Sequence, residues 1–218
     1  NYVKRLGTLS SLSFLIWYVL LFAAPATPAK RHVMLPARLP SSLYPNLEMK
    51  LVMGGLRPYN TEKAIDMADF LKAHWVEINQ RTKQPFTFNI LNDKNFVYDT
   101  EPASRAIIVA RTMNPEIEYT FFKAVQMAFY RDNKNTNLID TYLPIAAQFG
   151  LELNAFERFF NSEEIKTRTK ADFHLSQQFG IKGFPSLILK HNGNFTQLSN
   201  GYNEAKNIDL IIKKVLSE

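Results

Sequence analysis

The 218-residue sequence contains no cysteine. This absence excludes disulfide bonds, thiolate metal sites and every nucleophilic thiol in the chain as written. It also removes the usual indicator of the redox compartment. A hydrophobic content of 46% is that of a globular protein. The length suits either one large domain or one domain that carries an insertion.

Acidic residues are missing from the first fifth of the chain. Residues 1–47 hold five basic residues and no Asp or Glu, so the rest of the chain holds 21 of the 26 basic and all 20 acidic residues. The net charge of +6 therefore comes almost entirely from the N-terminal segment. Because the remainder is nearly neutral and shows no basic helix or zinc-finger spacing, the sequence does not predict a nucleic-acid surface.

Other patterns that would mark a site are also lacking. No Gly-Lys-Ser/Thr follows the glycine pair Gly54-Gly55, and no Gly-x-Ser-x-Gly motif occurs. No pair of histidines has a metal-binding spacing; they are His32, His74, His174 and His191. The sequence therefore predicts neither a metal site nor a bound cofactor.

The N-terminal apolar segment has two interpretations. Lys4 and Arg5, the apolar run Leu12–Ala24 and the small residues around Pro25 are typical of a secretory signal over residues 1–26. The 13-residue run is shorter than a transmembrane helix requires, so a membrane is a partner only if this segment is an anchor. Alternatively, the β-branched and aromatic residues of Phe14–Phe22 favour a buried first strand.

Regular patterns begin near Leu47. The alternating residues Leu47–Gly55 predict a strand that ends in a tight loop. After Pro58, apolar residues spaced by four and three predict a helix; they are Ala64, Ala68, Leu71, Trp75 and Ile78. Further helices are predicted over 103–111 with Thr100 as the cap, after Asn114-Pro115, over 138–149 with a kink or a shortening caused by Pro144, over 154–160, and over 163–179.

The C-terminal part changes character. Ser186–Lys190 and Phe195–Ser199 predict two strands joined by a hairpin turn at His191-Asn192-Gly193-Asn194, in which the glycine supplies a positive φ. Glu204–Leu216 predicts a final helix. The order of strand, several helices, strand, hairpin, strand and helix predicts an α/β protein.

Several segments, in order, resemble the DsbA family of thioredoxin-fold proteins, especially its FrnE-like branch of thiol-disulfide oxidoreductases and isomerases. They are LVMGGLRPYNTE (51–62), FVYDTEPASRA (96–106), AFYRDN (128–133), TKADFHLSQQFGIKGFPSLIL (169–189) and NGY (200–202). The resemblance covers about residues 47–218. It implies a thioredoxin fold with an inserted helical domain: residues 1–57 and 179–218 form the thioredoxin domain, and residues 58–178 form the insertion.

The resemblance also implies where substrates bind. In the family a cis-proline loop lies opposite the reactive thiols, and an extended substrate pairs with the backbone of that loop. Pro185 matches the cis-proline and Phe184 the residue before it, with Gly183 beside them. Gly54, Gly55 and Arg57 are further candidates for substrate contact. The implied partners are protein or peptide thiols and disulfides, and the family implies a cytoplasmic location, whereas a true signal peptide implies export.

One departure from the family pattern is large. The Cys-x-x-Cys motif should fall within Leu15–Ala26, and Ser104 stands where relatives often carry a further cysteine. Without a thiolate, the exchange chemistry of the family cannot run on this chain as written. A non-catalytic peptide-binding module is therefore one alternative. A relative of the kappa-class glutathione transferases is another, with Ser10, Ser11 and Ser13 as its candidate residues.

A shifted reading frame before about residue 45 is a further hypothesis. It accounts for the missing acidic residues, for the missing motif and for the abrupt start of the resemblance near Leu47. One permitted back-translation of Leu15–Val19, read one frame over, contains Asp-Met-Val-Cys. The sequence gives no indication of the oligomeric state.

Overall fold

A computed structural model describes residues 18–23, 48–82, 84–201 and 203–217. The chain divides into two compact units, one formed by residues 1–54 and 176–218 and the other by residues 55–175. The N-terminal and C-terminal parts of the sequence thus build one unit together, and the middle of the chain builds the second.

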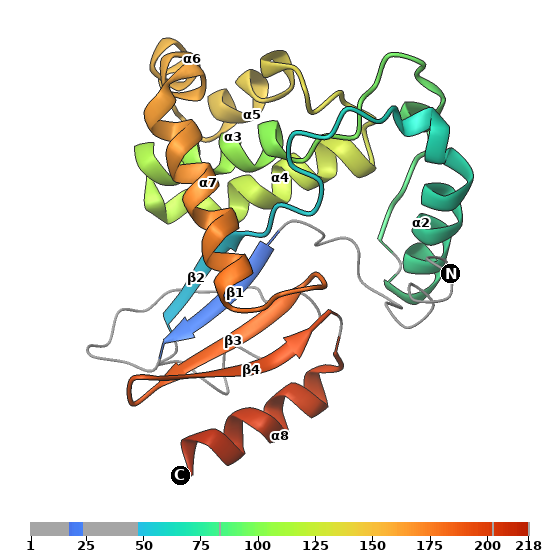
Figure 1. The fold of residues 1–218 in the computed structure, drawn as a ribbon. Coiled ribbons are helices and arrows are strands. Elements are labelled where there is room, and N and C mark those ends of the chain that lie inside the picture. Colours follow the sequence, from blue (N-terminus) through green and yellow to red (C-terminus); the bar gives the residue numbers. More distant parts are fainter. Residues whose placement is uncertain (1–17, 24–47, 83, 202, 218) are drawn as a thin grey trace. The chain divides into compact units, whose positions relative to one another are not determined.

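The first unit is built on a four-stranded mixed sheet (Figure 1). Its strands are β1 (Tyr18–Ala23), β2 (Glu48–Met53), β3 (Ser186–His191) and β4 (Asn194–Asn200), in the spatial order β2-β1-β3-β4. The strand β1 pairs antiparallel with β2 and parallel with β3, and β3 pairs antiparallel with β4. A strand at Tyr18–Ala23 agrees with the strand interpretation of the N-terminal segment.

The hairpin of β3 and β4 contains an irregularity that moves its register. Asn192 and Gly193 both have positive φ, as a tight two-residue hairpin turn requires. From this turn the pairing runs evenly to Ile188 opposite Gln197, and then shifts so that Leu187 lies opposite Ser199. Leu198 is the extra residue of a β-bulge. The bulge places Asn200 opposite Ser186 at the start of β3.

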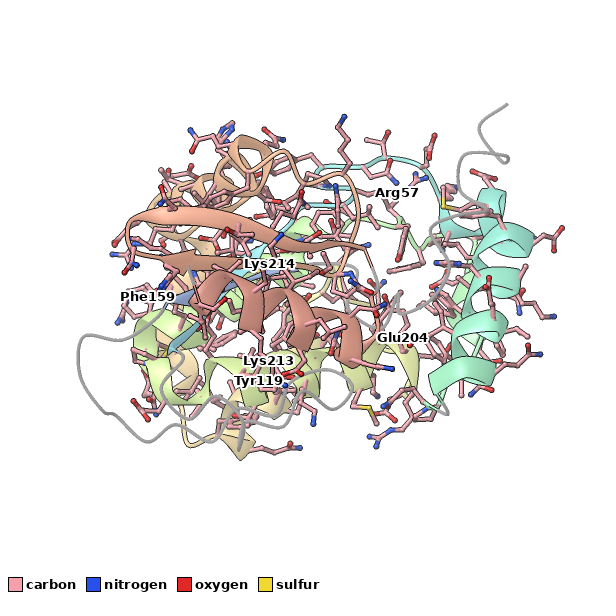
Figure 2. All side chains as sticks on the ribbon, turned by 90° about the horizontal axis from the view of Figure 1, so that it is seen from below. Arg57, Tyr119, Phe159, Glu204, Lys213 and Lys214 are labelled. Carbon is pink, nitrogen blue, oxygen red and sulfur yellow. The ribbon has the colours of Figure 1, made fainter. Side chains whose placement is uncertain are left out.

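The final helix α8 (Ala205–Leu216) packs on the hairpin strands (Figure 1). It buries Ile208 and Ile212, while Leu210 is exposed. Lys213 and Lys214 lie in its last turn, where positive charge offsets the helix dipole (Figure 2). The apolar residues therefore fix which face of the helix covers the sheet.

The helix α7 (Glu163–Gln178) ends at a glycine that determines where the next loop begins. Gly180 has a φ of 67°, its N–H donates to Gln177 O, and the N–H of Ile181 donates to Ser176 O. This pair of bonds is the Schellman arrangement, which needs a left-handed residue after the helix. Gly180 thus stops the helix, and the chain reaches β3 in five residues.

The second unit is helical. Its longer elements are α2 (Ala68–Thr82), α3 (Glu101–Met113), α4 (Glu118–Tyr130), α5 (Leu143–Gln148) and α6 (Leu153–Asn161), together with most of α7; the short 3₁₀ turns are η2 (Ala64–Met67), η3 (Asn89–Asn92), η4 (Pro115–Ile117) and η5 (Ile139–Thr141). Aromatic side chains form much of its core. Trp75 is fully buried, and its ring contacts those of Phe129 and Tyr130 edge-on.

Most of the predicted elements are present. The predicted helix over 138–149 is shortened at Pro144, as expected: the segment is divided into η5 and α5, because Pro144 fits only in the first turn of a helix. One detail differs. Thr100 precedes α3 as predicted, but its hydroxyl does not cap the helix and instead accepts a hydrogen bond from the N–H of Arg57. Within the described part of the chain, no helix is long and apolar enough to cross a membrane.

Candidate functional site

The loop from Ile181 to Pro185 is the centre of the candidate site in the first unit. It lies between the end of α7 and the start of β3, and its Phe184–Pro185 peptide bond is cis. Gly183 and Pro185 are buried, whereas Phe184 is half-buried and Lys182 is exposed. The loop therefore combines buried residues with a partly accessible aromatic ring.

Two side chains hold the loop backbone. The Oδ1 atom of Asn200 accepts hydrogen bonds from the N–H groups of Lys182 and Gly183, at 3.1 and 2.9 Å. The hydroxyl of Ser186 donates to Gly183 O at 2.6 Å and accepts from the N–H of Gly201 at 3.4 Å. We call these two side chains the loop clamp. The clamp uses no backbone group of Phe184.

Gly54 lies beneath the ring of Phe184, in the same unit. A Cβ atom on Gly54 would lie 2.0 Å from Cε1 of Phe184 and 2.5 Å from its Cζ. Real carbon atoms do not approach so closely, so only glycine allows the ring to occupy this position. Of the predicted substrate-contact residues, Gly54, Gly183, Phe184 and Pro185 all belong to this unit.

Gly55 and Arg57 belong to the second unit and have structural partners there. Gly55 has a φ of 63°, and a Cβ on it would lie 2.7 Å from the ring of Phe173. The guanidinium of Arg57 forms an ion pair with Glu62 at 2.8 Å. Its backbone N–H donates to Thr100 Oγ1. A role in substrate contact for Gly55 and Arg57 stays a prediction.

The direction of β1 determines which of its residues lie near the loop. Since β1 runs parallel to β3, Val19 pairs with Ser186 beside the loop, and Ala23 pairs with Lys190 at the other end of β3. These two positions are four residue-to-residue steps apart along the strand, which is about 13 Å. A motif that followed β1 would thus start away from Pro185. In the predicted Cys-x-x-Cys segment Leu15–Ala26, only residues 18–23 are described.

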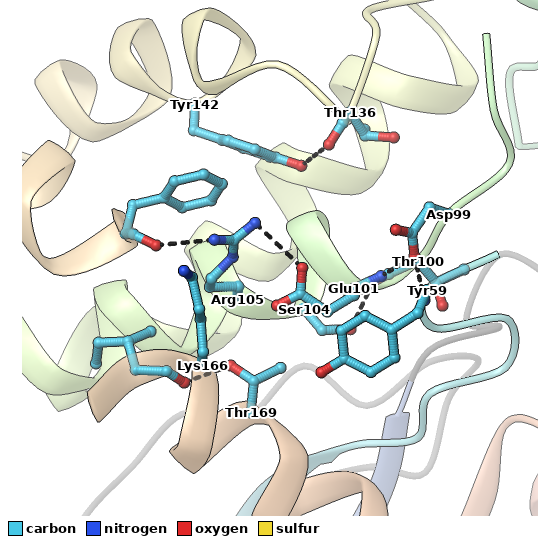
Figure 3. A network of polar contacts seen from close by, with 12 residues as sticks. Tyr59, Asp99, Thr100, Glu101, Ser104, Arg105, Thr136, Tyr142, Lys166 and Thr169 are labelled. Atoms are coloured by element: carbon cyan, nitrogen blue, oxygen red, sulfur yellow. Dashed lines mark hydrogen bonds and ion pairs between the residues drawn. The ribbon is translucent and has the colours of Figure 1, made fainter. Parts of the chain in front are cut away.

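A network of polar side chains lies in the second unit, at the start of α3 (Figure 3). The Oδ1 atom of Asp99 accepts from the N–H groups of Tyr59 and Glu101, at 2.8 and 2.9 Å. Glu101 is 5% exposed and forms an ion pair with Arg105 at 3.1 Å. The guanidinium of Arg105 also donates to Phe160 O. Asp99 therefore supplies the helix cap that Thr100 does not.

Burial changes the proton affinity of this network. Desolvation raises the pKa of Asp99, and the backbone hydrogen bonds that it accepts offset only part of this rise. Desolvation likewise raises the pKa of Glu101; Arg105 opposes this rise and Asp99 adds to it. The pKa of the half-exposed Tyr59 is also raised, again mainly by desolvation. All of these groups have partners within the unit, so the network is a structural one.

Other candidate residues are not drawn together. Ser104 is fully buried and its hydroxyl donates to Thr100 O. Ser10, Ser11 and Ser13 lie outside the described residues, so the glutathione-transferase alternative stays a prediction. No group of three or more metal-binding side chains occurs among residues 18–23, 48–82, 84–201 and 203–217.

The sheet order, the helix on the hairpin and the proline loop before β3 define a thioredoxin-fold protein with a helical unit inserted between its N-terminal and C-terminal parts. The DSBA-like thioredoxin domain family matches residues 46–211. The chain belongs to this family. The predicted DsbA-family membership and fold class are thus confirmed. No curated protein matches the sequence.

Solved structures agree on the fold. A candidate protein disulfide isomerase from Nitrosomonas europaea is 23% identical, with a TM-score of 0.66 over 92% of this chain and 98% of that one. The cytosolic disulfide reductase DsbM from Pseudomonas aeruginosa is 19% identical, with a TM-score of 0.66 over 92% of this chain and 100% of that one. A structure of DsbM with GSH gives a TM-score of 0.61 at 19% identity over the same shares.

The loop clamp is the part of the site that sequence reasoning missed. If the strand register continued regularly from the pair His191 and Asn194 at the hairpin turn, Ser186 would lie opposite Ser199. The bulge at Leu198 places Asn200 there instead. A signal was present, because Asn200 and Gly201 stand together in a segment that resembles the family. It carried no indication of what the asparagine side chain contacts.

Proposed function

We propose that this chain binds extended segments of protein or peptide at the Phe184–Pro185 loop, and that it does so without exchanging thiols. The observation that carries the proposal is the loop clamp. Asn200 and Ser186 fix the backbone of Lys182 and Gly183 through side chains. The backbone of Phe184 takes no part in this clamp and is suited to pairing with an added extended chain.

The ring of Phe184 supplies the second element of the proposed site. It rests on the bare backbone of Gly54 and is half-buried, so part of the aromatic surface can meet an apolar side chain. A backbone that pairs with any extended chain, together with one aromatic surface, favours unfolded or extended polypeptides over small molecules. Membership of the DSBA-like family supports protein partners of the same kind.

Thiol exchange requires a thiolate, and the sequence offers none. We therefore expect the chain as written to leave the rate of insulin reduction by dithiothreitol at that of a buffer control. A rate clearly above the control would contradict the non-catalytic part of the proposal. It would leave the binding part intact.

The binding test uses a permanently unfolded chain without free thiols, reduced and carboxymethylated α-lactalbumin, carrying a fluorescent label. We expect saturable binding by the wild type in fluorescence anisotropy and binding at least about tenfold weaker for Phe184→Ala, a loss typical of an aromatic anchor. Phe195→Ala is the matched control, because Phe195 is another partly exposed ring of the same unit. Equal affinity of the wild type and Phe184→Ala would refute the proposed site.

A second candidate is thiol-disulfide exchange by a protein whose N-terminal segment is encoded in another frame. For a strand to lead directly into a motif beside the Phe184–Pro185 loop, it must run antiparallel to β3, because the loop precedes β3. The present β1 runs parallel to β3. Together with the absence of acidic residues from 1–47, this direction supports the shifted-frame hypothesis.

The coding DNA decides this second candidate. Reading it in all three frames should reveal a Cys-x-x-Cys upstream of codon 47 if the hypothesis is right. The corrected chain should then accelerate insulin reduction, and replacing either cysteine by serine should abolish the acceleration. Absence of the motif in every frame would end the hypothesis and leave the binding proposal alone.

A further inference from the structure

We infer that Asn200 is a positioning residue of the proposed binding site, acting through the backbone of the Ile181–Pro185 loop. The expected effect of Asn200 on polypeptide binding rests on the proposed function, whereas its hold on the loop backbone does not. Asn200 is the last residue of β4, and its side-chain oxygen accepts both hydrogen bonds from the loop. It thereby connects the end of the hairpin to the residues before Phe184.

The hydrogen-bond geometry fixes the role of the asparagine oxygen. Two backbone N–H groups, those of Lys182 and Gly183, point at the same atom. Only the carbonyl oxygen of an amide side chain can accept both, since the amide nitrogen is a donor. An aspartate at this position can reproduce both bonds, whereas an alanine can reproduce neither. These two substitutions therefore separate the acceptor function from the mere presence of a side chain.

Ser186 complements this contact from the other strand. It is fully buried, donates its hydroxyl hydrogen to Gly183 O, and is paired with Asn200 in the sheet. Its distance to Asn200 Oδ1 is 3.5 Å, at the limit of a hydrogen bond. Because a serine has a single hydroxyl hydrogen, the 2.6 Å bond to Gly183 O takes it. Both polar groups of the Gly183 backbone are consequently held by side chains.

The exposure of Asn200 makes the inference testable without unfolding the protein. Asn200 is solvent-exposed, so truncating it leaves no cavity in the core. Gly183 is buried, so its N–H loses a partner that water replaces poorly. We expect Asn200→Ala to loosen the loop while the sheet remains folded. The matched control is Asn194→Ala, the same substitution at the other end of β4.

Hydrogen exchange tests the inference independently of any ligand. Amides of Lys182 and Gly183 should exchange roughly threefold to tenfold faster in Asn200→Ala than in the wild type, the range expected for loss of one ordinary hydrogen bond per amide. Asn200→Asp should restore protection, Ser186→Ala should reduce it at the loop, and Asn194→Ala should leave it unchanged. Unchanged protection of both amides in Asn200→Ala would overturn the inference.

Binding of carboxymethylated α-lactalbumin then tests the consequence. Asn200→Ala should weaken binding by roughly threefold to tenfold, and this loss should largely vanish in a Phe184→Ala background, because both substitutions act on one loop. A loss of equal size in both backgrounds would refute the positioning role. If the wild type fails to bind the unfolded chain at all, the proposed function fails, and the exchange data still decide whether Asn200 holds the loop.

Discussion

Replacing Gly54 by alanine tests whether the ring of Phe184 is seated as the structure shows. The new methyl group would lie 2.0, 2.5 and 2.7 Å from three atoms of the ring. Carbon atoms pack at about 3.5–4.0 Å, so the ring must move by about 1.5–2 Å. The φ of Gly54 is not in the left-handed region, so the alanine backbone itself is unstrained. The substitution thus isolates a packing effect.

The expected change in stability follows from two opposing contributions. Overpacking destabilises by about 1–3 kcal/mol. Replacing glycine in the unfolded chain stabilises by about 0.4–1 kcal/mol. We expect a net loss of about 1–2 kcal/mol in the free energy of unfolding, measured by urea denaturation. Because Phe184 has to leave its place, binding of the unfolded chain should weaken as well.

A double-mutant cycle shows whether the loss comes from the ring. In a Phe184→Ala background the methyl of Gly54→Ala meets no ring, so the substitution should be neutral or stabilising by about 0.4–1 kcal/mol. Coupling between the two positions of about 1 kcal/mol or more is the expected result. An equal loss in both backgrounds would refute the packing argument. It would also remove one support of the proposed site.

Two further predictions concern the second unit. Because the pKa of Asp99 is raised, the folded state binds more protons than the unfolded state at pH values between the ordinary and the folded pKa, so stability falls as pH rises through that window. Asp99→Asn keeps an acceptor oxygen but has no such titration, so its urea midpoint relative to that of the wild type should rise as pH goes from about 3 to about 6. A constant difference between the two midpoints would contradict this. Arg111 pairs with Glu118 and with Asp172 at 3.1 Å, so Arg111→Met should remove the cation that these two mostly buried carboxylates share and destabilise by about 3–5 kcal/mol in urea. Arg131→Met, at an exposed ion pair, should change the midpoint little, and an equally small change in Arg111→Met would contradict the expected loss.

Much of the fold could be predicted because local patterns and the final structure agree. The residues Asn192-Gly193 between two apolar runs predict the hairpin, and both adopt the positive φ that such a turn needs. The spacing of Leu71, Trp75 and Ile78 predicts one buried face of a helix, and all three are buried. Gly180 predicts the end of α7, because few residues other than glycine adopt the left-handed conformation that follows a helix.

The rest depends on contacts between distant residues. The apolar run around Tyr18–Ala23 predicts a strand, but alternation and composition contain no information about the direction in which a strand runs beside its neighbours. A bulge at Leu198 cannot be predicted from a strand of seven residues, so the partner of Ser186 could not be counted correctly. Thr100 is a residue type that often caps helices, but its hydroxyl accepts a hydrogen bond from the backbone N–H of Arg57, which is distant in sequence.

The central claim is that unfolded polypeptide binds at the loop of residues 181–185 in a chain that has no thiol. Hydrogen-exchange mass spectrometry of the wild type, with and without saturating carboxymethylated α-lactalbumin, tests it most directly. We predict slower exchange in the peptides that contain residues 181–187, and no comparable change in α8 or in the helical unit. Slower exchange confined to other segments, or no change at saturation, would contradict the account.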